Sequence, residues 1–127
     1  MSSGIDQLYD VAVVGGGLGG LVLTHTLVKR GYRVILVEKK KFPFHRVCGE
    51  YISNEVIPFL KKEGLFPDEL QPSKIDKFQL SSTSGKTLGM PLDLGGFGIS
   101  RYAFDHWLVD KIKRLSVTVL EDSPVTD

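Results

Sequence analysis

The feature of this sequence that most constrains its fold is the glycine-rich stretch Gly15-Gly16-Gly17-Leu18-Gly19-Gly20. Residues 9–14 before it have the composition of a strand that is buried on both faces, and residues 18–30 after it carry apolar side chains at helical spacing. Gly31 marks the end of that helix, and a second β-branched run follows at 33–37. This order predicts a βαβ crossover in a parallel sheet.

The spacing of the glycines predicts a dinucleotide site. Gly15, Gly17 and Gly20 fit the pattern Gly-x-Gly-x-x-Gly, which allows a tight turn, a close approach of a pyrophosphate and close helix packing, respectively. The pyrophosphate would meet free N–H groups at the positive end of the helix. Glu38 ends the second strand, where a carboxylate binds ribose hydroxyls and disfavours a 2′-phosphate. Taken alone, the glycine turn could be a structural loop, and Glu38 could be an exposed charge at the end of a strand. Because the two occur at the spacing of a dinucleotide-binding motif, together they favour a dinucleotide site.

The rest of the chain predicts a helix capped by Ser53 and ending at Gly64, a hairpin around the loop 82–86, a helix over 102–114 and a third parallel strand at 117–120. The hairpin, residues 76–92, interrupts the α/β pattern, and we assign it to a different sheet. The expected fold class is therefore α/β, a Rossmann-like half-domain of three parallel strands in the order 3-2-1 with an inserted β-hairpin.

Composition excludes several kinds of partner. The net charge is +1, which gives no long-range field for nucleic acid or an acidic membrane. No apolar run approaches the roughly 18 residues of a membrane span, and the amino terminus lacks the pattern of a secretory signal. With Cys48 as its one cysteine the chain forms no internal disulfide, which suits the cytoplasm. The three histidines show no metal-ligand spacing, so no metal site is expected.

Residues 11–38 resemble the FAD-binding motif of the group that includes para-hydroxybenzoate hydroxylase and geranylgeranyl reductases. The motif's apolar positions fall on Leu27 and Val34 and its acid on Glu38, while Thr24 stands where the family usually has alanine. The segment Arg46-Val47-Cys48-Gly49-Glu50 resembles the part that follows the second strand in the reductase and halogenase-like branches, although Tyr51 departs from the usual glycine.

This resemblance implies roles for individual residues. Arg46 would approach the FAD phosphates or the ribityl chain, Cys48 to Glu50 would border the isoalloxazine ring, and Arg101 would reach the flavin's linker. Simpler interpretations are a solvated charge for Arg46, a small buried hydrophobe for Cys48, an acid ahead of the Ser53 helix for Glu50, and a surface ion pair of Arg101 with Asp105. The expected cofactor-binding residues are Gly15, Gly17, Leu18, Gly19, Gly20, Glu38, Lys39, Arg46, Cys48, Gly49 and Arg101.

The resemblance covers only the beginning of a typical family member, so residues 1–127 are expected to be the amino-terminal part of an FAD/NAD(P)-binding domain, with the hairpin contributing to a substrate-domain sheet. The full-length protein would be an FAD-dependent oxidoreductase or monooxygenase that acts on a small-molecule substrate, with NAD(P)H as a candidate reductant, and the chain alone would be inactive. Alternatives are a non-catalytic nucleotide-binding module and a fragment of an NAD-dependent dehydrogenase. The sequence identifies no catalytic residue, substrate or oligomeric state.

Overall fold

The computed structural model describes residues 7–126, which form two compact units. One unit contains the chain up to Arg46 together with the chain from Tyr102 onward, and the other is Val47–Arg101. The expected lack of a secretory signal concerns residues 1–6, which lie outside the described residues. Within residues 7–126, none of the helices is both long and apolar enough to cross a membrane.

The first unit is built on a parallel sheet of β1 (Val11–Val14), β2 (Val34–Val37) and β6 (Thr118–Leu120), in the order β1-β2-β6. Val11 lies opposite Val34, and Ile35 lies opposite Thr118. The central strand is the most buried, because Val34 and Leu36 have 1% and 0% of their surface exposed. The predicted Rossmann-like fold and its strand order 3-2-1 are confirmed.

An ion pair joins the amino ends of β1 and β2. Arg33 Nη2 donates to Asp10 Oδ1 at 2.8 Å, and the Arg33 backbone N–H donates to Asp10 Oδ2 at 2.8 Å. These hydrogen bonds hold the pKa of Asp10 at about 2. The carboxylate therefore stays ionised to lower pH than an ordinary aspartate and retains its hydrogen bonds to Arg33 where the sheet begins.

Helix α1 (Leu18–Lys29) connects β1 to β2, as predicted. It ends where Gly31 takes a φ of +89° and donates its N–H to the Val28 carbonyl, the geometry of a helix carboxyl cap. Leu21 and Thr24 are fully buried on its inner face. The Thr24 hydroxyl has no hydrogen-bond partner there, so the departure from the family's alanine buries a polar group without compensation.

Helix α3 (Arg101–Lys113) precedes β6 and confirms the helix predicted over 102–114. The spacing of its apolar residues buries one face in the first unit, formed by Phe104, Leu108, Val109 and Ile112. Asp105 interrupts this face, although only 2% of its surface is exposed. A buried carboxylate requires a partner.

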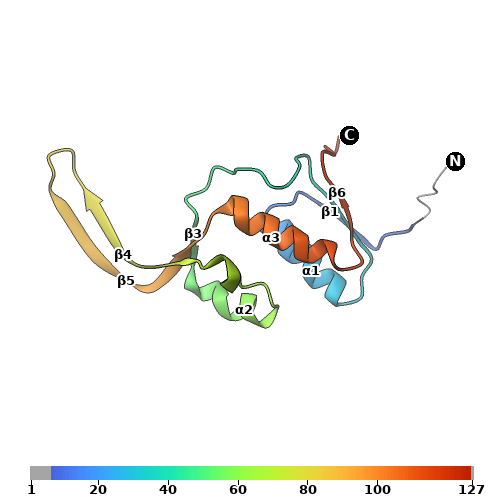
Figure 1. Cartoon of the computed structure of the whole chain (residues 1–127), viewed down its shortest axis with the longest axis horizontal. Helices are drawn as coiled ribbons and strands as arrows, with labels where there is room; N and C mark the ends of the chain where they lie inside the picture. Colours follow the sequence, from blue (N-terminus) through green and yellow to red (C-terminus); the bar gives the residue numbers. More distant parts are fainter. Residues whose placement is uncertain (1–6, 127) are drawn as a thin grey trace. The chain divides into compact units, whose positions relative to one another are not determined.

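The second unit contains an antiparallel sheet of β3 (Tyr51–Ser53), β5 (Thr87–Gly98) and β4 (Ser73–Ser81), in the order β3-β5-β4 (Figure 1). The predicted hairpin is confirmed, and its loop closes through a hydrogen bond of 2.8 Å from the Ser82 N–H to the Lys86 carbonyl. Its strands extend beyond the predicted ends. β3 was not expected, because three residues carry too little pattern to indicate a strand.

Ser53 occupies the predicted cap position, ahead of a 3₁₀ turn that leads into the helix, but it does not make the expected capping hydrogen bond. Ser53 also ends β3, and the 3₁₀ turn that follows it is Asn54–Val56. Helix α2 (Ile57–Lys62) begins only after that turn, with Pro58 in its first turn, and a second 3₁₀ turn (Asp68–Leu70) comes later. The small core of this unit is formed by Leu60, Leu65, Phe97 and Ile99.

Candidate nucleotide-binding site

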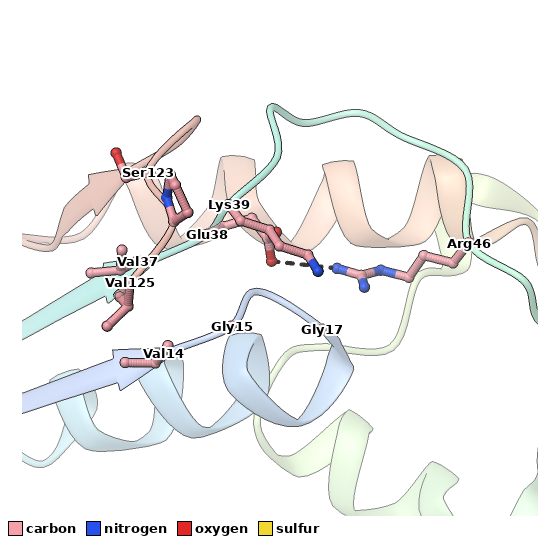
Figure 2. A pocket seen from close by; sticks show the side chains of 10 residues that line it. Val14, Gly15, Gly17, Val37, Glu38, Lys39, Arg46, Ser123 and Val125 are labelled. Carbon is pink, nitrogen blue, oxygen red and sulfur yellow. Dashed lines mark ion pairs between the residues drawn. The ribbon is translucent and has the colours of Figure 1, made fainter. Parts of the chain in front are cut away.

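A pocket of about 310 Å³ lies at the carboxyl ends of β1 and β2 in the first unit (Figure 2). Ligands of doubly wound sheets bind outside this edge. Five residues predicted from the sequence line the pocket: Gly15, Gly17, Glu38, Lys39 and Arg46. Val14, Val37 and the segment 123–125 complete it. The structure therefore brings the glycine turn, the acid and two cations to one place.

The glycine turn forms an open cradle. Gly15 takes a φ of +100°, and its N–H donates to the Val37 carbonyl at 2.8 Å, which ties the turn to the end of β2. Gly17 precedes α1 in an extended conformation, and no heavy atom lies within 4 Å of the position that its Cβ would take. Leu18, Gly19 and Gly20 form the first turn of α1. N–H groups at such a position lack intrahelical acceptors and suit an anion.

Glu38 fastens this turn to the loop that follows β2. Its Oε2 accepts the Gly16 N–H at 2.7 Å, and its Oε1 accepts the Lys40 N–H at 3.0 Å. Only 4% of the residue is exposed, so the alternative of an exposed strand-end charge is wrong. Each carboxylate oxygen can accept about two hydrogen bonds, which leaves acceptor capacity for ribose hydroxyls.

The structure predicts that Glu38→Ala destabilises the protein as well as its ligand site. The substitution leaves the N–H groups of Gly16 and Lys40 without their acceptor, which we expect to lower the free energy of unfolding by about 2 kcal/mol. Urea unfolding would measure the loss. Asp110→Ala is the control, because Asp110 is half-exposed and should change stability by less than about 0.5 kcal/mol. Equal effects of the two substitutions would contradict a fastening role for Glu38.

Arg46 lies over the glycine turn and is fixed by several groups. Its Nε donates to Asp105 Oδ2 at 2.8 Å, its Nη2 donates to the Gly16 carbonyl at 3.0 Å, and its guanidinium lies 4.4 Å from the centre of the Phe44 ring. The side chain also extends toward Glu38, with 3.7 Å between Nη2 and Oε2 (Figure 2). A solvated loop charge, the simpler interpretation, is therefore wrong for this residue.

The apolar wall of the pocket was missed by the sequence analysis. It is formed by Val14 and Val37 at the strand ends and by Pro124 and Val125 after β6. The Ser123 N–H donates to the Glu38 carbonyl at 3.0 Å and holds this segment beside the acid. The sequence could have indicated this wall, because the carboxyl end of the third parallel strand must reach the same edge of the sheet as the ends of the first two.

The remaining predicted residues, Cys48, Gly49 and Arg101, lie in the second unit. Cys48 is exposed, so it is not a small buried hydrophobe, and its Sγ accepts the Glu50 N–H at 3.3 Å and Arg101 Nη1 at 3.9 Å. Glu50 Oε1 accepts the Arg101 N–H at 3.0 Å, so this acid contacts the first residue of α3. A role for Cys48, Gly49 and Arg101 beside a flavin stays a prediction.

Known proteins share both sequence and fold with this chain. Residues 13–53 match the family described as an NAD(P)-binding Rossmann-like domain. Digeranylgeranylglycerophospholipid reductase of Methanocaldococcus jannaschii is 30% identical over 118 residues, which cover 91% of this chain and 29% of the reductase. The flavin-dependent halogenase CmlS is 28% identical, with a TM-score of 0.75 over 91% of this chain and 23% of the halogenase. A flavoprotein/dehydrogenase from Cytophaga hutchinsonii is 26% identical, with a TM-score of 0.76 over 93% of this chain and 31% of that protein.

The chain thus spans less than a third of the length of each of these relatives. The matches nevertheless run through both units, since they cover nine-tenths or more of the present chain. In sequence and fold the chain is therefore similar to a part of larger proteins that include a flavin-dependent halogenase and a flavoprotein/dehydrogenase, and this part contains the match to the NAD(P)-binding Rossmann-like domain.

Proposed function

We propose that this chain is the FAD-binding segment of a flavin-dependent oxidoreductase and that the pocket at β1 and β2 holds the ADP part of FAD. One observation carries the proposal: the same pocket has a polar wall and an apolar wall (Figure 2). The polar wall is formed by the glycine turn, Glu38 and Arg46, and the apolar wall includes Val14 and Val125. ADP has this combination of surfaces, with two phosphates, a ribose and a flat base. The similarity to a flavin-dependent halogenase and to a flavoprotein/dehydrogenase supports FAD as the whole ligand.

The residues of the pocket fit the ADP part group by group. The open cradle at Gly17 would take the pyrophosphate on the first N–H groups of α1, and Arg46 and Lys39 supply positive charge beside it. Glu38 would accept the ribose hydroxyls, and the apolar wall would cover the adenine. The volume is at the lower end of the range of about 300–1,000 Å³ that is typical of small-molecule sites.

FAD, when bound, supplies the hydride-transfer chemistry of such enzymes. The role that we assign to this chain is the binding and orientation of that cofactor. The full-length protein would then be a cytoplasmic enzyme that acts on a small molecule and uses NAD(P)H as reductant, while the chain alone would be inactive. The short span of the chain relative to its relatives supports this division.

We assign the hairpin over residues 76–92 to a sheet that helps to form the substrate domain of the full-length protein. Phe78 lies opposite Met90, and Leu80 lies opposite Leu88, so these four side chains share one face of the ribbon. All four are exposed by 44% or more. An apolar sheet face of this kind supports packing against further structure.

Titration of the purified chain with FAD, followed by flavin fluorescence, tests the proposal. We expect saturable binding that ADP competes away and that FMN, which lacks the adenosine part, does not affect. NAD⁺ is the informative comparison, because it shares the ADP part with FAD. Tighter binding of NAD⁺ than of FAD would favour the dehydrogenase alternative, and competition by FMN would contradict the assignment of the pocket to ADP.

A further inference from the structure

We propose that Asp105 is a positioning residue, which orients the Arg46 guanidinium and so directs its hydrogen-bond donors at the phosphate-binding turn. The inference rests on the proposed function, because it assigns a role in holding the phosphates of that ligand. Asp105 does not line the pocket itself. It lies on the buried face of α3, whereas the phosphate cradle lies at the start of α1.

The burial of Asp105 has no explanation in the packing of α3. Its neighbours on the buried face are apolar, and 2% of its side chain is exposed. An ionised carboxylate at such a place costs several kcal/mol unless a charged partner compensates it. The Arg46 side chain provides that partner at 2.8 Å, and it reaches Asp105 from the loop after β2.

The contact with Asp105 determines which donors Arg46 can present. A guanidinium has five N–H donors in a rigid plane, so fixing one of them orients the others. Asp105 holds the Nε–H, and the Gly16 carbonyl takes one donor of Nη2. The three remaining donors belong to Nη1 and Nη2. The Nη2 end also lies 3.7 Å from Glu38 Oε2, and Arg46 lines the pocket with 26% of its side chain exposed, so we expect the Nη1 donors to face an anion in the cradle.

Comparison of ADP with adenosine separates this role from a general contribution to folding. Asp105→Leu removes the acceptor and suits the apolar neighbours, and Asp105→Asn keeps the shape of the side chain should the leucine variant fail to fold. We expect Asp105→Leu to weaken ADP binding about tenfold and to leave adenosine binding within about twofold, because adenosine has no phosphate. Asp110→Asn, on the same helix and half-exposed, is the matched control and should change neither affinity.

A double-mutant cycle and an NMR measurement complete the test. In an Arg46→Met background, Asp105→Leu should cause no further loss of ADP affinity. Without any ligand, the Nε–H signal of Arg46 should be protected from solvent exchange in the wild type and lose that protection in Asp105→Leu. Equal losses for ADP and adenosine, additive effects in the cycle, or a wild-type Nε–H that exchanges freely would overturn the proposal. A wild-type chain that binds neither ADP nor FAD would instead overturn the proposed function, and this inference with it.

Discussion

Replacing Gly17 with aspartate is expected to lower the affinity for FAD at least about a hundredfold while leaving the fold intact. The fold should tolerate the change, because the φ of Gly17 is −75° and no heavy atom lies within 4 Å of the position of a Cβ. An acid beside the first turn of α1 is also favourable for the helix. The same carboxylate would occupy the cradle and repel a pyrophosphate, and like charges brought together cost several kcal/mol.

Gly17→Asn is the control that separates charge from size. Asparagine fills nearly the same volume without the negative charge, so it should lose less affinity for FAD than aspartate does. Fluorescence titration measures the affinities, and thermal unfolding verifies that both variants remain folded. If the aspartate variant retains the affinity of the wild type, the pyrophosphate does not bind at this turn, and the assignment of the pocket fails.

The first unit could be predicted from the sequence almost completely because its signals are local. The glycine turn has the spacing of a strand-to-helix crossover, and Gly31 marks the end of α1 with the positive φ that the structure contains. The valine-rich runs indicate buried parallel strands. Since each strand of such a sheet ends at the same edge, Glu38 and the glycine turn meet without any further assumption.

The features that the sequence did not reveal depend on contacts between distant residues. Asp105 and Arg46 are separated by 59 positions, so nothing in the spacing of either residue indicates their pairing. The same holds for β3, which exists because it pairs with the end of β5. Ser53 has the residue type of a helix cap and stands at the cap position of the 3₁₀ turn, but it also ends β3, and its side chain makes no capping hydrogen bond.

Gly20→Ala is expected to have the largest effect on stability of any substitution in the turn. The added Cβ would come within 1.9 Å of the Gly15 carbonyl oxygen, which belongs to the backbone of the turn. Neither the added Cβ nor the Gly15 carbonyl can move away without separating α1 from the end of β1. Overpacking at such a site costs about 3 kcal/mol or more, and urea unfolding of the variant would measure the loss.

The adjacent glycine provides the matched control for that experiment. Gly19 is exposed in the first turn of α1, and no heavy atom lies within 4 Å of its added Cβ. Gly19→Ala should therefore stabilise the protein by up to about 1 kcal/mol, because alanine has a higher helix propensity than glycine. The same change from glycine to alanine at two neighbouring positions is thus expected to lower the stability at one and to raise it at the other. A similar change in stability for both would show that α1 and the end of β1 are not packed as closely as the structure places them.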